Sequence, residues 1–144
     1  MNTNPPGTDK SRRPGSLREV SDIAAQHEGS FDGLLREFMD EFYMHEDEMR
    51  DSTREEPGKL DPVKDAYLAA LAEHLSTQYG LPYPSWASCP DRFLHEPFFA
   101  GGLENLKAIL LVESPAAFRR RMIFIDRDAL SSPRMQMGGG PKFA

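Results

Sequence analysis

The sequence predicts a mainly α fold: a single small domain of four to five short helices, a long loop rich in proline and aromatic residues, and disordered tails. Apolar residues recur at helical spacing in several segments, and capping residues precede those segments. Residues 1–15 and 131–144 contain too little apolar surface to offset the entropy of the chain. We therefore expect a helical domain over residues 16–130, with a tail on each side.

The first two helices are predicted to begin at serine residues. Ser16 and Glu19 have the spacing of a capping box, in which each side chain accepts a hydrogen bond from a backbone amide at the helix start. Gly29 ends the first helix, because glycine tolerates the left-handed cap conformation, and Ser30 can cap the second. The second helix has an apolar stripe at helical spacing, formed by Phe31, Leu34, Leu35, Phe38 and Phe42.

The stretch 40–56 is strongly acidic, and Arg50 and Arg54 are its only basic residues. Proline and glycine at positions 57 and 58 then break the chain. We expect the second helix to fray near His45 and the remainder of this stretch to be a solvated loop.

A third helix is predicted to start at Asp61 and Pro62, because Asp is a good N-cap and Pro is preorganised for the first helical position. Gly80 stops it, and the prolines at positions 82 and 84 prevent continuation. Its expected buried stripe is Val63, Ala66, Tyr67, Ala70, Leu71 and Leu75. The predicted core takes Leu34, Leu35, Phe38 and Phe42 from the second helix and Tyr67, Ala70, Leu71 and Leu75 from the third, together with Leu106, Leu110 and Phe118.

The last part of the domain is predicted to be an irregular segment followed by two short helices. Residues 85–102 place large apolar side chains among prolines; these should wrap the core, and an exposed subset would be a docking patch. Helices are expected at 103–113 and from 116 to about 121, the second launched by a Ser-Pro pair. Residues 122–125 are apolar and can be a strand or an extended stretch, since no second strand clearly pairs with them.

Composition restricts the class of protein. The formal net charge is −6, from 17 basic and 23 acidic residues, which argues against a protein that coats nucleic acid with its whole surface. Cys89 is the only cysteine, so no intramolecular disulfide can form, which fits a reducing cytosol. The first residues lack the apolar region of a secretory signal, and the longest apolar run is too short to span a bilayer. We expect a cytoplasmic protein that does not act on a membrane.

The sequence contains no convincing catalytic constellation. Glu41, His45 and Glu46 are candidate metal ligands on one helix, but neither Glu-x-x-His nor His-Glu-x-x-His occurs. Cys89 has Arg92 as its one basic neighbour close in the sequence, and no pattern places a histidine beside it to activate a thiolate. The three glycines at 138–140 lack the lysine and the following helix of a phosphate loop. We therefore expect no enzyme, no cofactor and no metal, and a metal-dependent enzyme on the second helix is the weakest alternative.

Arg119, Arg120 and Arg121 form the sharpest local charge feature of the chain. Consecutive helical residues point about 100° apart, so at most one or two of these arginines can address one ligand. They can pair with the acidic stretch 40–56 of the same chain, with an acidic site on a protein partner, or with nucleic-acid phosphates. Arginine suits each of these, because its planar fork binds carboxylate and phosphate in a bidentate manner.

A resemblance narrows these alternatives. Trp86, Phe98 and Phe99, followed by the string Ser-Pro-Ala-Ala-Phe-Arg-Arg-Arg at 114–121, are similar to a pattern in a group of small bacterial proteins. These are antitoxin-like proteins encoded beside nucleotidyltransferase-fold toxins, and some carry an added helix-turn-helix. The resemblance implies a non-enzymatic antitoxin of a toxin–antitoxin system, acting through protein–protein interaction, and it brings no catalytic residues. This chain has no recognisable helix-turn-helix.

On this basis the predicted partner-binding residues are the three arginines and three aromatic residues of the irregular segment. The expected partner is a toxin enzyme whose acidic metal site is occluded by the antitoxin. A regulator that binds nucleic acid through the arginines is the alternative. The sequence leaves the oligomeric state open. The partner-binding set is Arg119, Arg120, Arg121, Trp86, Phe98 and Phe99.

Overall fold

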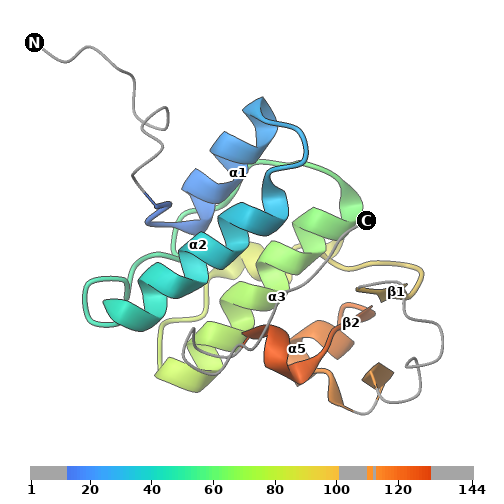
Figure 1. Ribbon diagram of the computed structural model, residues 1–144. Coiled ribbons are helices and arrows are strands. Elements are labelled where there is room, and N and C mark those ends of the chain that lie inside the picture. Colours follow the sequence, from blue (N-terminus) through green and yellow to red (C-terminus); the bar gives the residue numbers. More distant parts are fainter. Residues whose placement is uncertain (1–12, 101–109, 112, 131–144) are drawn as a thin grey trace, which may run out of the picture.

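The computed structural model describes residues 13–100, 110–111 and 113–130, and it has the mainly helical fold expected (Figure 1). The chain forms helices α1 (Leu17–Gln26), α2 (Phe31–Met44), α3 (Pro62–Tyr79) and α5 (Ala116–Arg119). Short 3-10 turns follow α3 at Ser85–Ser88 and Pro90–Arg92, and another lies after α5 at Arg127–Leu130. Residues 110, 111 and 113 are helical. The rest of the helix expected at 103–113, and most of both expected tails, lie outside the described residues.

The starts of α1 and α3 and the end of α3 follow the local sequence signals, whereas α1 ends at Gln26, before the predicted Gly29. The Ser16 hydroxyl accepts a hydrogen bond from the Glu19 amide at 3.1 Å, and the Asp61 carboxylate accepts one from the Lys64 amide at 2.9 Å. Gly80 ends α3 in the left-handed conformation, with φ of 65°. Ser30 is the N-cap residue of α2, as expected, but its hydroxyl donates to the carbonyl oxygen of His27 at 2.6 Å and makes no capping bond to α2.

Helix α3 is the centre of the fold, and it is buried on all sides along most of its length. One face packs against α2, where Tyr67 meets Phe31 and Tyr79 meets Phe42 in edge-to-face ring contacts. The other sides are covered by α5, by the two 3-10 turns that follow α3, and by the strand β2 (Ile123–Phe124). Of the predicted stripe, Val63 is only half-buried and the other members are buried. The alanines and leucines between those members are buried as well, because the chain wraps around α3.

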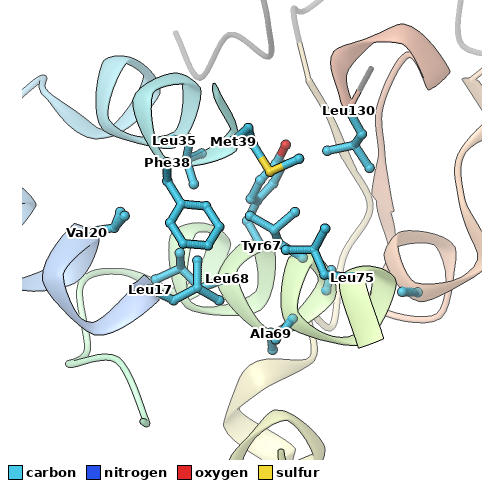
Figure 2. Close-up of a cluster of buried hydrophobic side chains, with 14 of the residues drawn as sticks. Leu17, Val20, Leu35, Phe38, Met39, Tyr67, Leu68, Ala69, Leu75 and Leu130 are labelled. Atoms are coloured by element: carbon cyan, nitrogen blue, oxygen red, sulfur yellow. The ribbon is translucent and has the colours of Figure 1, made fainter. Parts of the chain in front are cut away.

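The core unites these elements (Figure 2). The figure shows Leu17 and Val20 of α1, Phe38 of α2 and Leu68 of α3 converging between the helices. The described members of the predicted core are all buried, and all of them except Leu110 belong to this one cluster; Leu106 lies outside the described residues. Those members are Leu34, Leu35, Phe38, Phe42, Tyr67, Ala70, Leu71, Leu75, Leu110 and Phe118.

Residues 122–125 contain a strand whose partner lies in the segment expected to be irregular. Strand β1 (Phe98–Phe99) pairs in parallel with β2, with Phe98 opposite Ile123 and Phe99 opposite Phe124. The Phe98 amide donates to the Met122 carbonyl at 2.8 Å, and the rings of Phe99 and Phe124 stack at 5.0 Å. Each strand has two residues, so neither shows an alternating pattern, and the pairing depends on the tertiary fold.

The acidic stretch after α2 is a loop whose acidic side chains from 46 to 56 are exposed, as expected, but the loop is also anchored to the core. Successive turns run through residues 46–54, and Met49, Ser52 and Thr53 are buried. The Ser52 carbonyl accepts from the Leu17 amide at 2.9 Å, and the Thr53 carbonyl accepts from the Trp86 indole at 3.0 Å. These two bonds fix the stretch to α1 on one side and to the segment after α3 on the other.

In the part of the chain that the structure describes, no helix is both long enough and apolar enough to cross a membrane.

Candidate partner-binding surface

Arg121 belongs to the core, although the sequence placed it among the partner-binding residues. Its side chain is fully buried, and Nη1 donates to Glu73 Oε1 and to the Ala117 carbonyl at 2.8 and 2.9 Å. Nη2 donates to the Ala87 carbonyl at 2.8 Å, and the guanidinium lies 4.5 Å from the ring centre of Phe93. Arg121 therefore ties α3 and the turn Ser85–Ser88 to the end of α5, and it has no exposed surface for a partner.

Arg120 shares the same carboxylate but faces the solvent. Its Nη1 donates to Glu73 Oε2 at 2.6 Å, while 57 % of the Arg120 side chain is exposed. Among the described residues, its other guanidinium nitrogens make no hydrogen bond. Arg119, which precedes it, is also exposed. The single carboxylate of Glu73 thus pairs with two arginines, so the surface cluster formed by Arg119 and Arg120 carries an excess of positive charge.

Arg120 and Arg121 form their intramolecular ion pairs with a residue of α3 and not with the acidic stretch 40–56. Glu73 receives both Arg120 and Arg121. The acidic stretch is paired by Arg92, whose fully buried Nη2 donates to Glu56 Oε2 at 3.3 Å and to the Pro57 carbonyl at 2.8 Å. The sequence shows the charges of both segments, but only the fold decides which of them meet.

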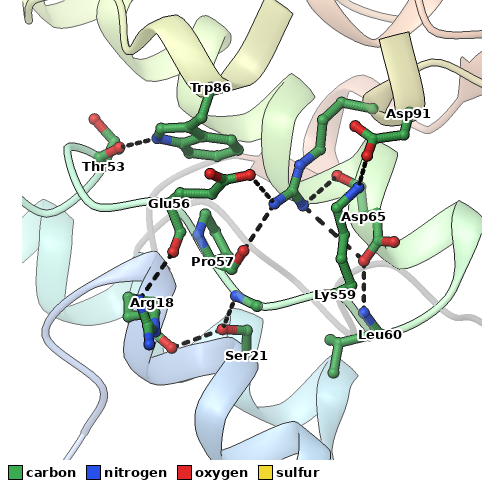
Figure 3. A network of polar contacts seen from close by, with 12 residues as sticks. Arg18, Ser21, Thr53, Glu56, Pro57, Lys59, Leu60, Asp65, Trp86 and Asp91 are labelled. Carbon is green, nitrogen blue, oxygen red and sulfur yellow. Dashed lines mark hydrogen bonds and ion pairs between the residues drawn. The ribbon is translucent and has the colours of Figure 1, made fainter. Parts of the chain in front are cut away.

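Polar contacts around Arg92 connect the start of α3 to the segment that contains Glu56 and Pro57 (Figure 3). Arg92 Nη1 donates to the carbonyl oxygen of Asp65 at 3.3 Å, and its guanidinium lies 5.0 Å from the ring centre of Trp86. The Asp65 carboxylate accepts from the Leu60 amide at 2.7 Å. Burial raises the pKa of Asp65 above its usual range, against the opposing effects of the Leu60 amide and of Arg92.

The three aromatic residues predicted to contact a partner are less exposed than Arg119 and Arg120. Trp86 is 6 % exposed, and its indole bonds to Thr53 within the fold. Phe98 and Phe99 are half-buried in the two-stranded sheet. Trp86 is therefore a residue that holds two segments together, and Phe98 and Phe99 present part of their surface beside β2.

A pocket of about 270 Å³ lies between the segments 50–54 and 82–85. Its lining includes the exposed side chains of Arg50, Arg54 and Tyr83. The sequence did not indicate this site, because one segment precedes α3 and the other follows it, so they meet only in the folded protein. The sequence feature that could have indicated the site is the presence of Arg50 and Arg54, four residues apart, in an otherwise acidic stretch.

The candidate metal ligands on α2 do not converge with other ligands. Glu41 lies 3.6 Å from His45 Nε2 and 3.8 Å from Arg13 Nη1. Across residues 13–100, 110–111 and 113–130, no group of three or more His, Cys, Asp or Glu side chains could hold a metal ion. His74, on α3, lies against the ring of Phe118, and burial lowers its pKa.

Comparison of the sequence with protein-family models, with curated proteins and with solved structures finds no match.

Proposed function

We propose that this protein is a non-enzymatic protein-binding module, the antitoxin-like partner of a bacterial nucleotidyltransferase-type toxin, acting in the cytoplasm. The supporting observation is the arrangement at the end of α5. Arg120 is half-exposed and anchored by Glu73 at 2.6 Å, and the exposed Arg119 lies beside it. The resemblance of residues 114–121 to antitoxin-like proteins supplies the class of partner.

An anchored arginine is suited to an acidic site on another protein. A long, mobile side chain loses conformational entropy when a partner immobilises it. The bond to Glu73 already restrains the Arg120 guanidinium, so part of that cost is met in the free protein. The nitrogens that do not contact Glu73 are then presented to a carboxylate, which arginine binds in a bidentate manner. In this proposal Arg119 and Arg120 enter the acidic metal site of the toxin and occlude it.

Charge favours a protein partner over a nucleic acid. The chain carries a net charge of −6, and a polyanion is repelled by that field over a distance of about one Debye length, roughly 8–10 Å. A local pair of arginines can still meet a local acidic site. Binding to nucleic acid through the same arginines is retained as an outcome of the test.

Growth rescue tests this proposal. The protein encoded by the neighbouring gene, which the proposal holds to be the toxin, is expressed from an inducible promoter, with and without this chain. Co-expression is expected to relieve growth arrest, and the double change Arg119→Glu with Arg120→Glu is expected to abolish the relief. Arg36→Glu is the matched control, because Arg36 is exposed on α2 and distant in sequence from the cluster.

Two results would contradict the proposal. The first is a neighbouring gene that encodes no such protein. The second is full rescue by the Arg119→Glu, Arg120→Glu variant when its circular dichroism and yield match the wild type. Loss of rescue accompanied by loss of binding to nucleic acid, with binding to the toxin intact, would favour the alternative.

A further inference from the structure

We propose that the pocket between segments 50–54 and 82–85 binds a peptide segment of a protein partner, one that carries a single carboxylate beside an apolar side chain. The pocket is distinct from the cluster of Arg119 and Arg120, because its cations are Arg50 and Arg54. The proposal therefore stands or falls separately from the antitoxin-like function.

The two walls of the pocket are joined, so its shape exists before any ligand arrives. Trp86, directly after the wall 82–85, donates its indole N–H to the carbonyl oxygen of Thr53 in the other wall at 3.0 Å. Arg50 Nη2 donates to the carbonyl of Gly80, at the end of α3, at 3.3 Å. A preformed site avoids the entropy of ordering two loops on binding.

The charge inside the pocket matches one carboxylate. Arg50 and Arg54 face a single acidic lining residue, Asp51, which lies 4.0 Å from Arg54 Nη1. Two cations and one anion leave one unit of positive charge. Both side chains of the Arg54–Asp51 pair are 82 % exposed, and exposed pairs of this kind contribute about 0–1 kcal/mol. Arg54 can therefore exchange Asp51 for a carboxylate of the ligand.

The surroundings of the pocket disfavour a polyanion. Exposed acidic residues flank the arginine-bearing wall on both sides, at 46–48 and at 55–56. A phosphodiester chain would carry a charge along its whole length past these carboxylates, whereas a peptide with one acidic residue would not. The flanking charges thus select for a peptide.

The apolar part of the site comes from Tyr83 and the prolines beside it. Tyr83 is 43 % exposed, and its hydroxyl accepts hydrogen bonds from Ser88 Oγ at 3.0 Å and from the buried Arg121 at 3.4 Å. The ring is therefore held in place while it remains accessible. Tyrosine and arginine are the residues most enriched at binding hot spots, along with tryptophan.

The size of the pocket limits the ligand to one or two side chains. Its volume of about 270 Å³ lies just below the roughly 300–1,000 Å³ of pockets that enclose drug-sized ligands. A carboxylate on Arg54 and an aromatic or aliphatic side chain against Tyr83 would fill it.

The test is a titration of the ¹⁵N-labelled full chain, followed by NMR, with the acetylated and amidated peptide Gly-Phe-Glu-Phe-Gly. The matched peptide Gly-Phe-Gln-Phe-Gly removes the carboxylate, and a short oligothymidylate and inorganic phosphate provide the other anions. We expect the acidic peptide to shift the Arg54 Nε–H and Tyr83 signals and to bind about ten-fold more tightly than the amide peptide. Arg54→Gln should remove that difference. Arg36→Gln, at an exposed site on α2, should not.

Two kinds of result would overturn the proposal that the pocket binds a peptide. Equal binding of the two peptides, or no shift at Arg54 and Tyr83, would overturn the proposal. Stronger binding of oligothymidylate or phosphate than of the acidic peptide would overturn it in favour of a phosphate site. The single change Arg119→Glu leaves the contacts of Glu73 with Arg120 and Arg121, and of Arg121 with Tyr83, in place. This variant should bind the acidic peptide as the wild type does, so failure of this pocket and failure of the antitoxin-like function are distinguishable.

Discussion

Replacing Glu73 with glutamine removes the charge that compensates two arginines of very different burial. The Arg121 side chain is fully buried, and its Nε already lacks a hydrogen-bond partner among the described residues. Arg120 is 57 % exposed, so water can replace the lost contact. Breaking a buried pair costs about 3–5 kcal/mol, and glutamine keeps one acceptor oxygen, so we expect a loss of about 2–4 kcal/mol. The melting temperature should fall by roughly 10 °C or more.

Urea unfolding followed by circular dichroism measures this loss. Arg120→Met and Arg121→Met form an internal comparison, because both arginines contact the same carboxylate. Arg120→Met should cost less than about 1 kcal/mol. Arg121→Met should be clearly more costly, and combining it with Glu73→Gln should cost about 1–3 kcal/mol less than the sum of the two changes. Glu37→Gln, at an exposed site on α2, should change stability by no more than about 0.5 kcal/mol. Equal effects of the two arginine changes would refute the reasoning.

Two further predictions concern α3. Leu71 is fully buried, so Leu71→Ala should destabilise the fold by about 2–5 kcal/mol in the same urea assay; an unchanged melting temperature would remove Leu71 from the core. Burial lowers the pKa of His74 below its ordinary 6.5, so the folded state binds fewer protons than the unfolded state. The stability that neutral His74 contributes is present above pH 6.5 and is lost as the pH falls through the folded-state pKa. His74→Gln should flatten the fall in unfolding free energy over this window, and a slope like that of the wild type would contradict the assignment; His27→Gln, at an exposed position, is the control.

The helices could be predicted because their signals are local. Ser16 and Asp61 cap α1 and α3 through amides three residues away, and Gly80 ends α3 because it tolerates a positive φ. The apolar stripes identify the faces that are buried. What they could not show is that α3 is enclosed on all sides, because that depends on segments which the sequence alone does not place.

The roles of the arginines could not be predicted, since they depend on contacts between distant parts of the chain. Arg121 meets Glu73 across 48 positions, and Arg92 meets Glu56 across 36. Adjacent arginines in the sequence therefore differ completely: Arg121 is a core residue and Arg120 is a surface residue. The prediction of a surface cluster applies to Arg119 and Arg120 alone.

The strand pair and the pocket could not be predicted either, because both depend on contacts between distant parts of the chain. Phe98 and Ile123 are neighbours in a sheet whose strands have two residues each, too short for a periodic pattern. The pocket unites Arg54 with Tyr83 only because the indole of Trp86 ties their segments together. Trp86 was expected to contact a partner, and its burial at 6 % exposure instead gives it a positioning role.

Calorimetric titration tests the central claim most directly. The purified chain is titrated into the protein encoded by the neighbouring gene, which the proposal holds to be a nucleotidyltransferase-type toxin, and into single-stranded RNA as a comparison. We predict stoichiometric binding to the protein that is lost in the Arg119→Glu, Arg120→Glu variant, retained in Arg36→Glu, and stronger than binding to RNA. Binding to the protein that survives reversal of both charges, or tighter binding to RNA that collapses with salt, would contradict the account.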